Sequence, residues 1–122
     1  MNKSIIAVGF DGTCVTHEYP EVGQNIGAQQ ILKKLVADGS KLILWTMRSG
    51  HELDEAVKWF KDNQIPLFGI QRNPEQDSWT SSNKAYATLY IDDAALGCPL
   101  EYPKSGKLPY VDWEKVNALL FP

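Results

Sequence analysis

The residues that follow Ser4 form an unbroken apolar run up to Phe10, and this run constrains the fold more than any other feature of the sequence. Apolar and polar side chains do not alternate in it, which is typical of a strand buried on both faces in the middle of a parallel sheet. The run stops at the polar break Asp11-Gly12-Thr13. We therefore predict a buried strand over residues 4–10 with a polar turn at its carboxyl end.

Helical and strand-like segments alternate along the rest of the chain. We predict further strands over residues 41–46, 66–70 and 88–91. Helices are predicted over about residues 24–38 with a stop at Gly39, from the capping residue Ser49 onward, over about 83–87, and over 113–120 after the capping residue Asp112. We expect loops at residues 14–23, 72–82 and 94–111. This alternation favours a parallel sheet with right-handed crossovers, in a single three-layer, Rossmann-like α/β domain of about five strands over residues 1–122.

The composition fits one globular domain and argues against several classes of function. The chain has 122 residues, 43% of them hydrophobic and 22% charged, which is enough for one core. Its 12 basic and 15 acidic side chains give a net charge of -3, so no cationic surface for nucleic acid is expected. Two cysteines, Cys14 and Cys98, are too few for a disulfide scaffold. The run 5–10 is too short to span a membrane, and we expect a cytoplasmic protein with no membrane partner.

Polar side chains gather just past the carboxyl ends of three predicted strands. They are Asp11 and Thr13 after the first strand, Thr46 and Arg48 after the second, and Asp92 and Asp93 after the fourth. Ligands bind at this edge of an open α/β sheet. Carboxylates gathered there suit a hard cation, and Mg2+ is usually held by one or two carboxylates together with phosphate oxygens. The hydroxyl of Thr46 and the ammonium of Lys84 are groups that orient a phosphoryl group and offset its charge.

The order of these residues resembles the four motifs of the haloacid dehalogenase-like (HAD) superfamily. The motifs are Phe10-Asp11-Gly12-Thr13, a strand that ends in Thr46, Lys84 upstream of a strand, and the pair Asp92-Asp93. The match spans residues 5–93, and the stretches 17–20 and 84–93 look like a small, capless, phosphatase-like subgroup. The resemblance implies the usual HAD core. The intervals 14–23 and 71–83 are too short for an inserted cap domain.

The resemblance also implies a role for each site residue. Such enzymes use one aspartate to attack phosphorus, forming an aspartyl-phosphate, and a second aspartate two residues on as general acid and base. The second position is Asp11, whose backbone carbonyl would also ligate Mg2+. The implied roles of the others are phosphoryl binding for Thr46, charge support for Lys84, metal binding for Asp92 with Asp93 as its neighbour, and substrate contacts for Gly12, Thr13, Arg48 and His17.

The chain departs from the HAD pattern at the nucleophile position, which is occupied by Gly9. Glycine supplies neither an attacking oxygen nor an anionic metal ligand. We therefore expect a Mg2+-dependent phosphohydrolase scaffold whose activity is impaired or absent. The alternative is a non-catalytic module that binds Mg2+ and a phosphorylated ligand. A phosphoacceptor receiver domain fits less well, because its acidic pair follows the first strand and its lysine lies near the end of the chain.

The sequence allows two interpretations for several residues. Arg48 either touches substrate or pairs with a nearby acid, and His17 contacts substrate or is an ordinary loop residue. Cys14 is expected to be a small packed residue, because no basic partner for a nucleophile is evident. Trp45, Trp59 and Trp113 are expected in the core, whereas Trp79 either packs or lines the mouth of the site. The expected partner is a phosphorylated substrate, and the open site is compatible with a homo-oligomer.

Overall fold

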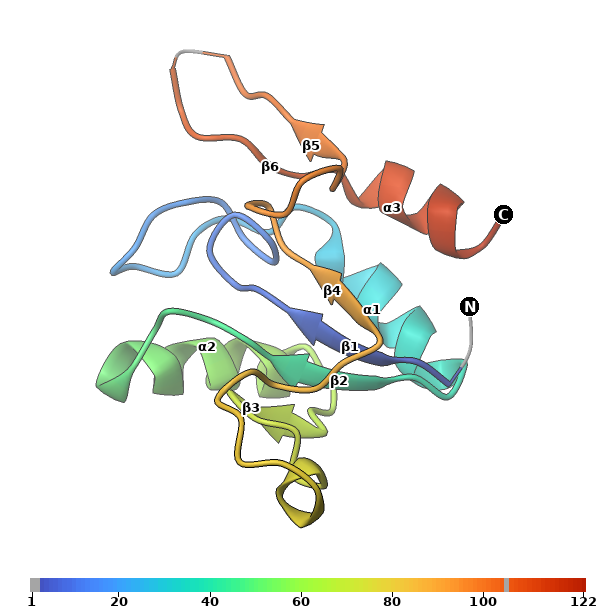
Figure 1. The fold of residues 1–122 in the computed structure, drawn as a ribbon. Coiled ribbons are helices and arrows are strands. Elements are labelled where there is room, and N and C mark those ends of the chain that lie inside the picture. The colour runs from blue at the N-terminus through green and yellow to red at the C-terminus, as the bar shows by residue number, and fades with distance from the viewer. Residues whose placement is uncertain (1–2, 105) are drawn as a thin grey trace.

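The computed structural model describes residues 3–104 and 106–122 and contains a four-stranded parallel sheet (Figure 1). The strands lie in the order β3-β2-β1-β4. Their bounds are β1 Ile5–Val8, β2 Lys41–Leu44, β3 Gly69–Ile70 and β4 Leu89–Ile91. The predicted α/β class with a parallel sheet is confirmed, with four strands instead of about five. Among the described residues no cap domain is inserted into this core.

The apolar run at the start of the chain becomes the inner strand β1. It pairs in parallel with β2 on one side, from Ile5 with Lys41 to Val8 with Leu44, and with β4 on the other. Ile6, Ala7 and Val8 are all buried, so successive side chains are covered on both faces of the sheet. This double burial is the reason why the run does not alternate between apolar and polar residues.

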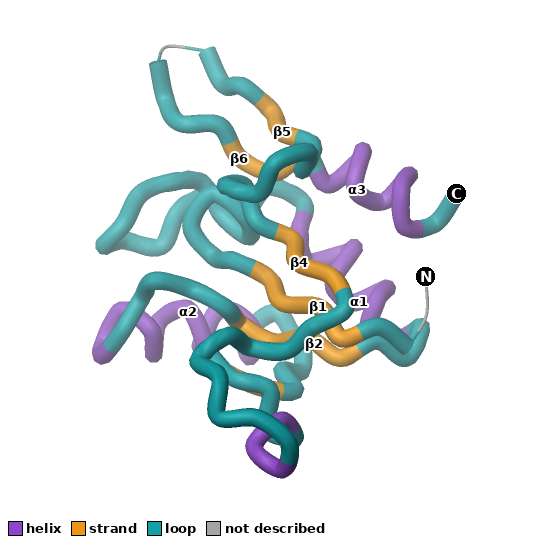
Figure 2. Tube along the Cα trace, viewed as in Figure 1, coloured by secondary structure: helices purple, strands orange, loops and turns teal. Residues whose placement is uncertain are grey.

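Both faces of the sheet are covered, by different kinds of structure. Helix α1 (Ala28–Ala37) lies in the connection from β1 to β2, and helix α2 (Gly50–Asp62) lies in the connection from β2 to β3. Both connections cross over in the same direction, which places the two helices on one face, and Figure 1 shows both behind the sheet. The crossover from β3 to β4 runs in the opposite direction. Figure 2 shows this long connection in front of the sheet, as irregular chain with only the 3-10 turn η1 (Gln76–Ser78).

The carboxyl-terminal region differs from the expected irregular chain. It forms a short antiparallel hairpin of β5 (Leu100–Glu101) and β6 (Tyr110–Val111), which is followed by helix α3 (Trp113–Leu120). The hairpin docks on the first loop, since the Val111 N–H donates to the carbonyl of Gly12. The predicted cap of α3 is confirmed, because the Asp112 carboxylate accepts a hydrogen bond from the Lys115 N–H.

Other helix predictions need correction. Helix α1 begins at Ala28 instead of about residue 24, because Gly27 adopts a left-handed conformation (φ 92°) and Asn25 forms a bridge with Val15. Ser49 does precede α2, but its side chain makes no capping hydrogen bond. No helix forms over 83–87, where the backbone is held by side-chain hydrogen bonds instead. The predicted stop of α1 at Gly39 is confirmed by its φ of 96° and its hydrogen bond to Val36.

The core lies between the sheet and the helices. Phe10 packs edge-on against Trp59, and Trp113 is buried and donates its indole N–H to the carbonyl of Thr13. Cys14 is fully buried, as expected for a packed residue, and burial raises the pKa of its thiol well above the usual value. Trp45 is only partly buried, for a reason given below. In the described part of the chain, no helix is both long enough and apolar enough to cross a bilayer.

Candidate functional site

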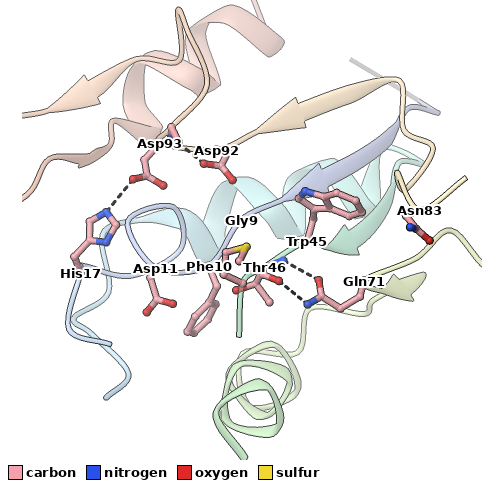
Figure 3. Close-up of a pocket in the computed structure, with 12 residues that line it drawn as sticks. Gly9, Phe10, Asp11, His17, Trp45, Thr46, Gln71, Asn83, Asp92 and Asp93 are labelled. Atoms are coloured by element: carbon pink, nitrogen blue, oxygen red, sulfur yellow. Dashed lines mark hydrogen bonds and ion pairs between the residues drawn. The ribbon is translucent and has the colours of Figure 1, made fainter. Parts of the chain in front are cut away.

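A cavity of about 550 Å³ opens at the carboxyl ends of the four parallel strands. Its walls come from the ends of β1, β2, β3 and β4 and from the loop before β4 (Figure 3). Six of the residues singled out in the sequence line it: Gly9, Asp11, His17, Thr46, Asp92 and Asp93. The rule that strand ends gather at one edge of a parallel sheet therefore brings these residues together.

Asp11 and Arg48 form a bidentate ion pair. The Nε–H and one Nη2–H of Arg48 each donate to a different carboxylate oxygen of Asp11 at 2.8 Å. The Arg48 side chain is 1% exposed, and it also donates to three backbone carbonyls, those of Pro20, Glu21 and Glu52. The hydrogen bonds to Asp11 raise the pKa of the guanidinium from its usual value.

The pairing with Asp11 bears on the two interpretations of Arg48. The guanidinium is enclosed between Asp11, the three carbonyls and the rings of Phe10 and Tyr19, and it does not line the cavity. The structure thus places Arg48 against Asp11 and not at the cavity wall, which favours pairing with an acid over contact with substrate. Arg48 fixes Asp11 and ties the loop after β1 to the start of α2.

Both carboxylate oxygens of Asp93 also have a side-chain partner. One of its carboxylate oxygens accepts from the hydroxyl of Thr13 at 3.0 Å, and the other lies 2.8 Å from Nε2 of His17. Gly12 lies directly beneath this pair, with φ 78°, and a Cβ there would overlap both His17 and Asp93. Gly12 and Thr13 are buried and are not among the residues that line the cavity, so in this structure they shape the site from behind its wall.

Asp92 differs from the other two aspartates. One oxygen accepts from the backbone N–H of Ala94 at 2.8 Å, but among the described residues no cation forms an ion pair with it. Its other oxygen lies where a side chain at position 9 would begin, 2.8 Å from a Cβ placed on Gly9. Burial raises the pKa of the Asp92 carboxyl above its usual value, and the nearby charge of Asp93 acts in the same direction.

Thr46 lines the cavity, and its backbone is held by a residue that the sequence analysis missed. The amide of Gln71 accepts from the Thr46 N–H at 2.8 Å and donates to the Thr46 carbonyl. Gln71 directly follows β3, so the strand-end rule that selected Asp11 and Thr46 also points to it. Trp45, which was expected in the core, lines the cavity instead, as do Met47 and Asn83.

Lys84 is not brought to this cavity. Its ammonium lies 5.3 Å from the centre of the Tyr90 ring and borders a second hollow on the sheet face covered by residues 71–88. The preceding residue, Asn83, reaches the cavity in its place (Figure 3). The structure therefore gives Lys84 no contact with the aspartates, and the role implied for it by the resemblance does not fit.

The electrostatics of the cavity are acidic. Three aspartates line it, whereas its described lining includes no lysine or arginine. Asp11 is neutralised by Arg48, and in Figure 3 its carboxylate points away from Asp92 and Asp93. Accordingly, the described residues contain no group of three or more ligating side chains that could hold a metal by themselves. Asp92 is the one lining carboxylate that forms no ion pair with a lysine, arginine or histidine among the described residues.

Fold and cavity together define an α/β protein with a parallel sheet and a ligand-sized cavity at its carboxyl edge. Neither a known family profile nor a curated protein matches the sequence significantly. Among solved structures, a conserved protein of Bacteroides thetaiotaomicron is similar, with a TM-score of 0.78 and 35% sequence identity over 98% of this chain and 90% of that one. At this identity and coverage, the chain belongs to the same family as the Bacteroides protein.

Proposed function

We propose that this chain is an HAD-like protein that binds Mg2+ together with a phosphorylated ligand and does not hydrolyse that ligand. The observation that carries the proposal is the Asp92 carboxylate, which lies in an acidic cavity against Gly9 and has no cationic partner among the described residues. A partly buried carboxylate without a counter-ion is destabilised in its charged form, and a cation reduces that penalty. Asp92 is also the residue to which the resemblance assigns the metal.

The residues present fit a weakly held Mg2+ ion that is shared with a ligand. Mg2+ tolerates few protein ligands when phosphate oxygens and waters complete its shell. Asp92 and the backbone carbonyl of Asp11 are the groups that would hold it. When bound, the ion would neutralise charge on the phosphate. An anionic ligand needs this help, because no lysine or arginine is found among the described residues that line the cavity.

Two features argue against hydrolysis by the HAD mechanism. Gly9 has no side chain to attack phosphorus, and a Cβ there would lie 2.8 Å from the Asp92 carboxylate and the Thr13 hydroxyl, so a larger residue fits only when these side-chain ends shift. Asp11, the implied acid and base, has both carboxylate oxygens committed to Arg48. Because a nucleophile must stand in line with the leaving oxygen, Asp11 does not replace the missing group.

The binding proposal is tested by calorimetric titration with Mg2+ and p-nitrophenyl phosphate, each alone and then together. We expect each to tighten the binding of the other, since linkage is reciprocal. Asp92→Asn should abolish this coupling, whereas Asp54→Asn, at an exposed position in α2, should leave it unchanged. Equal binding of the phosphate ester with and without Mg2+ would refute the proposal.

The lack of hydrolysis is tested by phosphate release from the same ester with Mg2+. We expect none from the parent chain and measurable release from Gly9→Asp, whose carboxylate would attack phosphorus, release the alcohol and then be freed by water. Gly9→Asn is the matched control, because it has the same bulk near Asp92 and Thr13 but no nucleophilic carboxylate. Release by the parent at a rate comparable to Gly9→Asp would show that another group attacks phosphorus.

A further inference from the structure

The second hollow, of about 350 Å³, lies beside the cavity and is lined by three aromatic side chains. Trp79 is 64% exposed, and its ring contacts that of Tyr86 edge-on, with centroids 5.4 Å apart at 85°. Tyr90, on β4, completes the set. Large aromatic side chains are usually mostly buried, and exposed ones that converge on one hollow offer faces for stacking a flat ring.

The backbone that carries Trp79 and Tyr86 is held in place by a buried glutamine. The backbone carbonyl of Gln76 accepts from the N–H groups of Trp79 and Thr80, and its side-chain oxygen accepts from the Tyr86 N–H at 2.8 Å. The amide nitrogen donates to the carbonyls of Ser82 and Lys84. The loop is irregular, yet its backbone is fixed on both sides of the hollow. Because this backbone is already ordered, only side-chain freedom is lost when a ligand stacks on the rings.

The polar side chains around the hollow include an ammonium, which only donates, and hydroxyls, which donate and accept. Lys84 has no ion pair among the described residues, and its ammonium lies over Tyr90. Thr80 and Ser82 add hydroxyl groups, whereas the described lining residues include no carboxylate, and the one side-chain amide among them, that of Gln76, is already bonded at both its oxygen and its nitrogen. Ammonium and hydroxyl donors match the carbonyl and ring-nitrogen acceptors of a nucleobase. The hydroxyl oxygens also accept hydrogen bonds, so the polar groups alone do not separate a base from a sugar ring, and the titrations below distinguish the two.

The hollow and the cavity adjoin each other along two segments. On one side, Asn83 lines the cavity while its neighbours Ser82 and Lys84 line the hollow. On the other, Tyr90 lines the hollow and Asp92 lines the cavity, which separates them by about 7 Å of extended chain. One pentose bridges such a gap between a base and a phosphate.

We propose that the hollow beside Trp79, Tyr86 and Lys84 binds a nucleobase, so that the phosphorylated ligand of this protein is a nucleotide. The base stacks on Trp79 with its acceptors toward Lys84, and its phosphate reaches the cavity at Asp92. The position of the phosphate rests on the function proposed above, whereas the base-binding hollow stands on its own contacts.

The test is a titration of the parent chain with adenosine and with adenosine 5′-monophosphate, followed by the NMR signals of the tryptophan indoles and by calorimetry, with and without Mg2+. We expect both compounds to perturb Trp79, and the nucleotide with Mg2+ to bind more tightly. Trp79→Ala should weaken the binding of both by about tenfold or more, and Trp79→Phe should retain most of it. Tyr102→Ala, at an exposed ring outside both hollows, should leave it unchanged.

Each contrary result has a separate meaning. Absence of saturable adenosine binding, or no loss in Trp79→Ala, would overturn the nucleobase site. So would an equal loss of glucose 6-phosphate binding in Trp79→Ala, because the ring would then be a sugar. Nucleotide binding that needs Mg2+ and Asp92 but not Trp79 would overturn this inference and leave the proposed function standing. Equal binding of adenosine and its monophosphate, lost in Trp79→Ala, would support the nucleobase site and overturn the phosphate site.

Discussion

Replacement of Arg48 by methionine should destabilise the protein more than any other change at the site. The substitution keeps much of the apolar stem but removes the guanidinium, and with it two hydrogen bonds to Asp11 and three to backbone carbonyls. Breaking a buried ion pair on one side typically costs about 3–5 kcal/mol. The Asp11 side chain is 17% exposed, and Pro20 and Glu21 are exposed residues whose carbonyls regain water. The expected loss is therefore near the lower end, about 3 kcal/mol.

The assay is urea unfolding followed by circular dichroism. With a urea slope typical of small proteins, a loss of about 3 kcal/mol lowers the midpoint by roughly 1–3 M. Arg48→Lys should lose most of the same energy, since one ammonium cannot reproduce the planar fork. The matched control is Arg72→Met, which breaks a partly exposed ion pair with Asp77 and one hydrogen bond to the Ser82 carbonyl and should cost about 1–2 kcal/mol. If Arg48→Met lost no more than this control, the role given to Arg48 would be refuted.

Three further predictions concern Asp92, Gly12 and the helix caps. Burial raises the pKa of Asp92, so the stability that this group contributes is fully present below its unfolded pKa of about 3.9 and is lost as pH rises through the folded pKa. Asp92→Asn should therefore unfold at higher urea than the parent at pH 7 without Mg2+, and the gain should vanish near pH 3. Gly12→Ala should lower stability by at least the 1–2 kcal/mol typical of a left-handed alanine and should displace His17 from Asp93, which thermal unfolding and the histidine NMR signals would report. Asp112→Ala should cost about 1 kcal/mol, whereas Ser49→Ala should cost less because Ser49 makes no capping bond, and equal losses in urea unfolding would contradict this.

The sequence predicted the sheet and the gathering of strand ends because both follow from regular patterns. The uninterrupted apolar run located β1, and the polar residues after β1, β2 and β4 converge at one edge, as the geometry of parallel strands requires. The same rule, applied to the end of β3, would have found Gln71.

Other features depended on contacts between segments with no periodic pattern. Lys84 was assigned to the site by its place in the chain, but the direction of its side chain is set by the loop that Gln76 organises. The pairing of Arg48 with Asp11 and the hairpin of β5 and β6 are likewise long-range contacts. Local sequence propensities do not predict such contacts. They also misled at two places, because Ser49 makes no capping hydrogen bond and residues 83–87 do not form a helix.

The strand order β3-β2-β1-β4 determines when during folding the site is completed. The hydrogen bond between Ser4 and Ser40 beside β2 closes 36 residues, whereas that between Ile5 and Thr88 beside β4 closes 83. Closing the longer loop costs only about 0.6 kcal/mol more per doubling of length, but pairings distant in sequence form slowly. We therefore expect β4 to dock last and to open first, carrying Asp92 and Asp93 with it. In hydrogen exchange, the Gly9 amide bonded to Ile91 should then exchange before the Trp45 amide bonded to Val8.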